Sequence, residues 1–246
     1  MNICLFTQEE IKKPLPIQDE RAEHIIKILH KKVGETFTAG IIDGKAGTAK
    51  IQSIGESITF TFEPITDGKT LFPLIMIVGF PRPIQLKRLL RDVAALGLSE
   101  IHLTGTELGE KSYMQSKLVE DGNAQKMLLD GTVQAASTHI PKLFLHKNLN
   151  ECLHYIQNNE DYAKSQKITL DNVNPDCSLS SVFTKSEKID SVIAAIGSER
   201  GWTDSERNLF SVNDFTKCGM GQRIMRTETA VTVAGSIILD RMGFLN

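Results

Sequence analysis

Apolar, strand-like segments alternate with amphipathic, helix-like segments from Leu74 onward, and this alternation limits the possible folds more than any other feature of the chain. Strands that alternate with helices form a parallel sheet covered by helices on both faces. The sequence therefore predicts an α/β domain over residues 71–246. The predicted strands are residues 74–80, 100–105, 142–146, 167–170 and 189–197, and the predicted helices are residues 85–97, 117–138, 149–157, 203–210 and 227–243.

The first 70 residues follow a different pattern and predict a small β-barrel. Short strands with turn signals between them are predicted at residues 36–43, 47–54 and 57–64. One short helix is predicted from Asp19, as its N-cap, to Gly34. Residues 64–73 contain two prolines and a glycine and are predicted to link this domain, residues 1–70, to the next.

Ligands of open parallel sheets bind beyond the carboxyl ends of the strands, so the loops after Leu170 and Ile196 are candidate sites. The second loop reads Gly197-Ser198-Glu199-Arg200-Gly201 and precedes a helix that begins near Thr203. Thr203 and Glu206 have the spacing of a capping box. The glycines allow a close approach of the backbone to a ligand. An ordinary turn with a surface ion pair fits the same residues.

The stretch GMGQRIMRTETA, residues 219–230, is the second candidate because it places cations at the start of the last predicted helix. Thr227 is predicted to cap that helix, and Glu228 suits the positive end of its dipole. Arg223 and Arg226 do not suit that end and call for an anionic partner. Glu199, Glu228, a phosphate or a ligand carboxylate would serve, and a structural pair with Glu228 is the simplest alternative.

Composition and motif searches argue against several other classes of protein. The net charge of −2 gives no global signal for nucleic acid, so RNA contacts would need a local basic patch. No metal site is predicted, because the histidines lack ligand spacing and the cysteines are scattered. The chain lacks Gly-x-Ser-x-Gly and both common phosphate-loop motifs. Its longest apolar run, about seven residues, is too short for a bilayer, and we expect a cytoplasmic protein.

Four segments together resemble one family over nearly the whole chain. They are HIIKILHKKVGE, LGLSEIHLTGTE, IGSERGWTDSE and MGQRIMRTETA. Their order and spacing resemble the 16S ribosomal RNA uridine-N3 methyltransferase family of the trefoil-knot (SPOUT) class. That family carries Ile-Gly-Pro-Glu-Gly-Gly before a helix that contains glutamate, and Leu-Gly-x-Arg-Ile-Leu-Arg-x-Glu-Thr-Ala before its last helix. Only Met220 and Met225, in place of leucines, depart from the second motif.

The resemblance implies an N-terminal PUA-like RNA-binding β-barrel and a C-terminal domain whose last segment threads a knot. It also implies a homodimer that acts on 16S rRNA of the small ribosomal subunit, with S-adenosylmethionine bound by the loops of the knot. Apolar walls and backbone hydrogen bonds would suit the adenine ring. The implied cofactor-binding residues are Leu170, Ile196, Gly197, Gly201, Met220, Gly221, Ile224, Met225 and Arg226.

The implied chemistry assigns roles to three charged residues. Methylation at N3 of uracil removes the imide proton, and negative charge then develops on N3 and the neighbouring carbonyl oxygens. A fixed guanidinium stabilises that charge, with Arg226 as the first candidate and Arg223 as the second. Glu199 or Glu228 orients the arginine, or Glu199 accepts the proton.

Departures from the family pattern leave other functions open. Arg200 replaces a glycine in the cofactor loop, and His30 replaces an arginine near the N-terminus. Gln134-Ala-Ala-Ser-Thr138 lacks the arginine of the family's Gln-x-x-Arg segment. Lost phosphate contacts would weaken RNA binding and its salt dependence. A non-catalytic RNA-binding or ribosome-assembly protein with the knot fold, or a methyltransferase with another RNA target, are the alternatives.

Overall fold

The computed structural model describes residues 2–183 and 189–245, except for the side chains of Leu118 and Glu120. Contacts divide the chain into two compact units. The N-terminal unit comprises residues up to 71 together with 129–140, and the C-terminal unit comprises residues 72–128 and 141 onward. Residues 129–140 are therefore an addition to the N-terminal range that the sequence pattern suggested. Each unit is described by itself.

The N-terminal unit contains a mixed five-stranded sheet in the order β1-β3-β4-β5-β2. β1 pairs in parallel with β3, and the other neighbours are antiparallel. Because β1 and β2 stand at opposite ends of this order, the sheet forms an open half-barrel and not a closed barrel. The strands are β1 (Cys4–Phe6), β2 (Leu15–Pro16), β3 (Thr36–Ile41), β4 (Ala46–Ile54) and β5 (Ser57–Thr66).

Two local predictions for this unit are wrong in detail. The helix after Asp19 is one α-helical turn, α1 (Glu20–Glu23), which continues as a π-helix over His24–Ile28. β5 continues to Thr66, two residues beyond the predicted strand and into the predicted linker, and Pro64 pairs with Gly47 next to an irregularity in the β4–β5 register. A bulge tolerates a proline in a sheet because the ladder hydrogen bond is already interrupted there.

The C-terminal unit confirms the predicted α/β class. All seven strands of its sheet are parallel, in the order β10-β12-β9-β11-β6-β7-β8. The strands are β6 (Phe72–Gly79), β7 (Leu98–Thr104), β8 (Lys142–His146), β9 (Gln166–Leu170), β10 (Cys177–Ser178), β11 (Val192–Ile196) and β12 (Thr216–Gly219). The helices are α2 (Pro83–Leu96), α3 (Lys117–Glu120), α5 (Leu149–Gln157), α6 (Asp204–Val212) and α7 (Thr227–Arg241). A further helix, α4 (Asn123–Gln134), begins in this unit, and its residues from 129 onward belong to the N-terminal unit.

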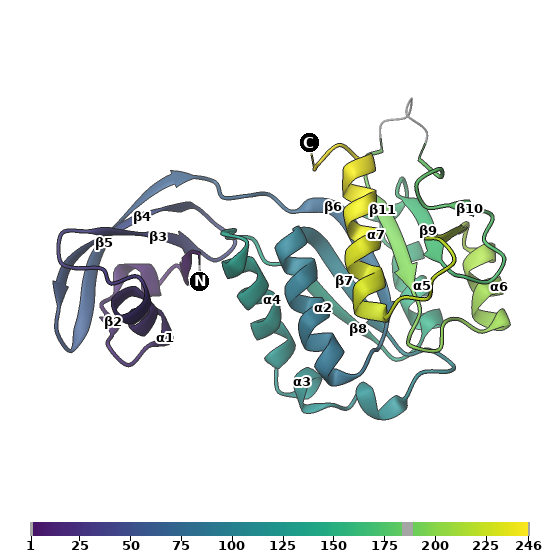
Figure 1. Ribbon diagram of the computed structural model, residues 1–246, viewed down its shortest axis with the longest axis horizontal. Helices are drawn as coiled ribbons and strands as arrows, with labels where there is room; N and C mark the ends of the chain where they lie inside the picture. Colours follow the sequence, from purple (N-terminus) through teal and green to yellow (C-terminus); the bar gives the residue numbers. More distant parts are fainter. Residues whose placement is uncertain (1, 184–188, 246) are drawn as a thin grey trace. The chain divides into compact units, whose positions relative to one another are not determined.

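Helices cover both faces of this sheet (Figure 1). Successive side chains of a strand point to opposite faces, and in these strands the apolar side chains of both faces are buried. Ile75 and Ile77 of β6 pack in one cluster with residues of α5 and α6. Met76, between them, lies on the other face, where it approaches Gly235 of α7. α2 and α7 lie side by side on that face. No helix among the described residues has the length and apolarity needed to cross a membrane.

β12 occupies an unusual place in the sheet. It lies between β9 and β10, although residues 171–176 join those two strands directly. The joining loop therefore crosses over β12, and a Cβ atom added at Gly219 would lie 2.9 Å from Pro175 Cγ. This crossing of the C-terminal segment by an earlier loop is the strand arrangement expected of the predicted knot. Sequence patterns missed both β10 and β12 because strands of two and four residues carry too little periodicity.

A buried group of polar side chains lies between β7, β8 and α5. His102 Nδ1 is 3.0 Å from His146 Nε2, and His102 Nε2 is 3.4 Å from Glu100 Oε2. One potential ligand atom each from His102, His146 and Cys152 lies within 4.8 Å of the other two. Sequence spacing did not reveal this group because its members come from two strands and a helix. Two of the ring nitrogens, His102 Nδ1 and His146 Nε2, already hydrogen-bond to each other.

The position of His146 predicts a pH dependence of stability. Burial, with repulsion from His102, lowers the pKa of His146 from 6.5 to about 4. Between these values the unfolded chain binds a proton that the folded chain excludes, so stability is complete above pH 6.5 and falls as the pH drops toward 4. We expect urea unfolding to show a loss of about 2 kcal/mol from pH 7 to pH 5.

His146→Gln should remove most of that loss, whereas His154→Gln, at an exposed position of α5, should leave it unchanged. An unchanged pH dependence in His146→Gln would show that other groups cause it.

Candidate functional site

The carboxyl ends of β9 and β11 and the segment after β12 surround a cavity of about 280 Å³, here named the loop cavity. This volume lies near the lower end of the range for small-molecule sites. Of the residues predicted for cofactor binding, seven line it: Leu170, Ile196, Gly197, Gly201, Met220, Ile224 and Met225. Arg223 and Glu199 line it as well. Gly221 and Arg226 do not, although both are in the adjoining segment.

The loop after β11 is a tight turn. The Gly201 amide donates to the Ser198 carbonyl at 2.9 Å, and Gly201 has a φ of +72°, a conformation that favours glycine. A Cβ at Gly201 would meet nothing within 4 Å, so its open side faces free space. A Cβ at Gly79, the last residue of β6, would lie 2.4 Å from Ser198 N. The turn therefore sits directly against the end of β6.

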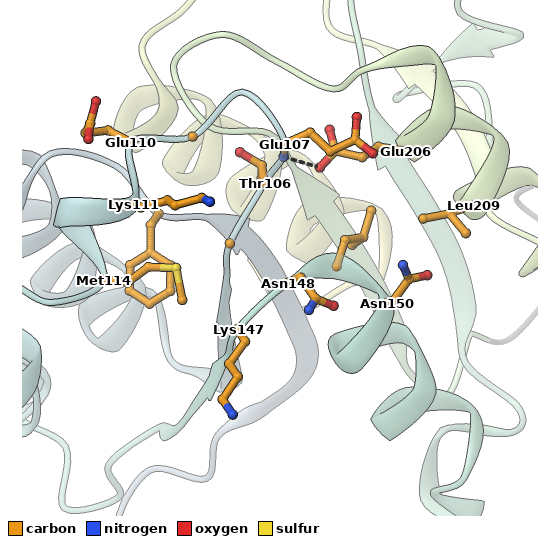
Figure 2. Close-up of a pocket in the computed structure, with 14 residues that line it drawn as sticks. Thr106, Glu107, Glu110, Lys111, Met114, Lys147, Asn148, Asn150, Glu206 and Leu209 are labelled. Carbon is orange, nitrogen blue, oxygen red and sulfur yellow. Dashed lines mark hydrogen bonds between the residues drawn. The ribbon is translucent and has the colours of Figure 1, made fainter.

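The predicted capping box at the start of α6 is confirmed. Glu206 N donates to Thr203 Oγ1 at 3.2 Å, and Thr203 N donates to Glu206 Oε2 at 2.9 Å. The second carboxylate oxygen of Glu206 accepts the Glu107 amide at 2.9 Å (Figure 2). A single buried carboxylate thus fixes the start of α6 to the loop after β7.

The last helix does not begin as predicted. Its N-cap is Arg226, and Thr227 is the first helical residue. Thr227 Oγ1 instead donates to the Gly197 carbonyl at 3.3 Å. The hydroxyl does not cap the helix because the segment between β12 and α7 brings Thr227 against the loop after β11. This contact joins the two candidate stretches into one site.

The arginines of the second stretch have no protein counter-ion in the described part of the chain. Arg223 and Arg226 are exposed and form no ion pair there, so the structural pair with Glu228 is not present. Glu199 pairs instead with Arg82, at 3.2 Å from Nε to Oε2. Of the anionic partners considered from sequence, a phosphate or a ligand carboxylate remains.

Several residues of the loop cavity were not named from sequence, among them Asp171, Trp202 and Arg207. Asp171, directly after β9, accepts Arg207 Nε at 2.6 Å, and this hydrogen bond raises the pKa of Arg207. Trp202 is 2 % exposed, and its Nε1 is a buried donor without a partner among the described residues. Asp171 could have been predicted from sequence, since it is polar and directly follows the carboxyl end of a strand. Trp202 could not, because a lone tryptophan is usually a core residue.

A second cavity, of about 370 Å³, lies at the first turns of α2 and α7 and is here named the helix cavity. It is lined by the N-cap residues of the two helices, Arg82 and Arg226. Gln85 of α2 and Glu228 of α7 line it as well. Five residues line both cavities, so the two are neighbours: Ser198, Glu199, Ile224, Met225 and Thr227.

A third cavity, of about 460 Å³, continues along the same edge of the sheet at the ends of β7 and β8 (Figure 2). Lys111, Lys147, Asn148 and Asn150 give it amine and amide groups. A small cavity of about 100 Å³ shares residues with both the third cavity and the helix cavity. Polar cavities therefore follow the carboxyl edge of the sheet from β8 to β9.

Comparisons with known proteins agree with this arrangement. The sequence model of a family described as an RNA methyltransferase domain matches residues 69–239. The chain is 42 % identical to ribosomal RNA small subunit methyltransferase E of Treponema pallidum, over 97 % of this chain and 91 % of that protein. It is 34 % identical to ribosomal RNA small subunit methyltransferase E 1 of Borreliella burgdorferi, over 97 % of both.

A crystal structure of the Neisseria gonorrhoeae ribosomal RNA small subunit methyltransferase E, bound to S-adenosyl methionine, has the same fold. Its TM-score is 0.77 at 18 % identity, and the match covers 98 % of this chain and 97 % of that chain.

Proposed function

Because this chain belongs to the ribosomal RNA small subunit methyltransferase E family, we propose that it methylates N3 of a uridine in 16S rRNA with S-adenosylmethionine as methyl donor. One observation carries the uridine chemistry. The loop cavity shares a wall with a helix cavity whose Arg226 has no counter-ion in the described part of the chain. A site for a small ligand thus adjoins a cation that is available for developing negative charge.

The residues of the loop cavity fit S-adenosylmethionine. Leu170, Ile196 and Met225 give apolar walls that suit an adenine ring. The open side of Gly201 leaves room for close approach to the backbone, and the Trp202 Nε1 donor lacks a partner among the described residues. When bound, the cofactor supplies the methyl group that is transferred.

The helix cavity supplies the groups that the uridine needs. Arg226 stabilises the charge that develops on the imide as the proton leaves. Glu228 is 9 % exposed, and its carboxylate forms no hydrogen bond or ion pair within the described residues, so it is available to accept that proton. Glu199 forms an ion pair with Arg82, and this pair positions the Arg82 guanidinium in the cavity. We therefore propose Glu228 as the proton acceptor, in place of Glu199, the residue named for that role from sequence.

The proposal includes a homodimer, a cytoplasmic location and RNA binding by the N-terminal domain, residues 1–70. Two apolar side chains support a protein contact: Ile224, which lines the helix cavity, is 87 % exposed, and Ile84 of α2 is 63 % exposed. Exposed apolar surface commonly marks interaction sites.

Calorimetry separates this function from that of a non-catalytic RNA-binding protein. The alternative is motivated by Arg200, which lines the loop cavity where the family has a glycine. We expect S-adenosylmethionine to bind with a Kd in the range of about 1 μM to 1 mM that is usual for enzyme substrates. No binding at millimolar cofactor would favour the non-catalytic protein. Binding together with methylation of RNA pools other than 16S rRNA would point to another RNA target.

A further inference from the structure

We propose that the helix cavity binds the target uridine, and that the side-chain amide of Gln85 bridges the uracil O2 and the ribose 2′-hydroxyl of that nucleotide. The proposal deepens the function above and rests on it. It adds a residue that reads RNA at the target position.

The Gln85 amide has no partner in the described part of the chain. Its Oε1 atom is buried without a hydrogen bond, and its Nε2 atom forms none there either. Leaving a buried acceptor unsatisfied is unfavourable, and rotation of the amide would turn this oxygen toward a donor of a ligand in the cavity that Gln85 lines. Gln85 follows Pro83 in the first turn of α2, so its side chain is placed by a regular helix.

The charges of the cavity favour an imide over a phosphate. Two arginines, Arg82 and Arg226, face two carboxylates, Glu199 and Glu228. Glu228 is nine-tenths buried and would repel a group that carries a permanent negative charge. Uracil arrives neutral and becomes anionic only as its proton leaves. This deprotonation needs a nearby carboxylate that takes the proton and a nearby cation that stabilises the anion, and the cavity has both.

The position of the cavity suits methyl transfer. Ile224 and Met225 line both cavities, so the two cavities adjoin along these residues, and a base in the helix cavity can present N3 toward the loop cavity beside them. N3 must remain open toward the loop cavity. The N3–H group therefore cannot be the permanent partner of Gln85.

Elimination leaves the 2′-hydroxyl as the partner for Gln85 Oε1. A uridine within a chain has two good hydrogen-bond donors, the N3–H and the 2′-hydroxyl, and the reaction uses the first. The O2 atom lies beside the 2′-hydroxyl, and Nε2 of the same amide can donate to it. Arg226 then remains for the O4 side of the imide.

A double-mutant cycle, with Gln85→Leu as the change in the protein and removal of the 2′-hydroxyl as the change in the RNA, tests this contact. Small ribosomal subunits are assembled with 16S rRNA that carries a single 2′-deoxyuridine at the position methylated by the wild-type protein. We expect this change to lower kcat/KM of the wild-type protein on the order of tenfold, the effect of one hydrogen bond. Gln85→Leu should lose a similar factor on unmodified subunits and then at most about twofold more on deoxy subunits, since the partner is already absent.

Two further variants exclude a merely structural role. Gln85→Glu keeps the shape and the acceptor but puts a carboxylate oxygen in place of the donor, and that oxygen repels the uracil O2 as negative charge develops on the imide. It should therefore be slower than Gln85→Leu and still sense the deoxy change. Gln157→Leu, at an exposed position of α5, should match the wild-type protein on both substrates. Calorimetry should give the same cofactor Kd for all variants, because Gln85 does not line the loop cavity.

Losses that multiply to about 100-fold in Gln85→Leu on deoxy subunits would overturn the contact, since independent changes add in free energy. A wild-type protein that is insensitive to the deoxy change would overturn it as well. A wild-type protein that leaves unmodified subunits unmethylated would overturn the proposed function and this inference together.

Discussion

Replacing Arg226 by alanine is expected to lower kcat for methyl transfer on the order of 100- to 1,000-fold, the usual cost of losing a group that stabilises an anionic transition state. The Kd for S-adenosylmethionine should change little, because Arg226 lines the helix cavity and not the loop cavity. The physical reason is that charge appears on the uracil imide only during the reaction. A cation that faces this charge therefore contributes to kcat more than to binding.

Three variants sharpen this prediction. Arg226→Lys keeps the charge but loses the planar fork, and should fall between the wild-type protein and Arg226→Ala. Arg241→Ala, at the other end of α7, should be neutral. Arg223→Ala changes the second candidate, which lines the loop cavity, and should affect cofactor affinity more than kcat. A larger loss of kcat in Arg223→Ala than in Arg226→Ala would exchange the two roles.

Gly79→Ala is expected to weaken cofactor binding by about tenfold or more and to destabilise the protein by about 2 kcal/mol. The added methyl group would lie 2.4 Å from Ser198 N and 2.7 Å from Thr106 Cγ2. Neither atom can yield cheaply, since Ser198 N is backbone and the Thr106 hydroxyl donates to Ser198 Oγ at 2.9 Å. The turn from Ser198 to Gly201 would move, and with it one wall of the loop cavity.

Calorimetry with S-adenosylmethionine and thermal unfolding measure both effects of Gly79→Ala. Gly55→Ala is the matched control, because a Cβ atom there meets nothing within 4 Å. If Gly79→Ala bound the cofactor with the Kd of the wild-type protein, the close packing of the turn against β6 would not contribute to cofactor binding.

Sequence patterns predicted the features that extend over many residues. The alternation of strands and helices from β6 onward gave the parallel sheet, since each long element repeats its apolar period several times. The capping box of Thr203 and Glu206 is equally local and was found. The family resemblance also named seven of the residues that line the loop cavity, and they lie together because they follow strand ends that one sheet brings side by side.

Features that depend on tertiary placement were beyond the sequence. Thr227 appeared to be a cap, but the threaded chain brings its hydroxyl to Gly197. Arg82 and Glu199 pair across 117 positions of sequence, which no local pattern signals. The orphan amide of Gln85 in α2 was equally invisible, since a glutamine on a helix is usually solvated.

Nucleoside mass spectrometry of 16S rRNA from cells with and without the gene tests the central claim most directly. We predict that N3-methyluridine is present in 16S rRNA of the parent strain and absent in the deletion strain. The wild-type gene should restore it, and the Arg226→Ala gene should not. An unchanged amount of N3-methyluridine in the deletion strain would contradict the account.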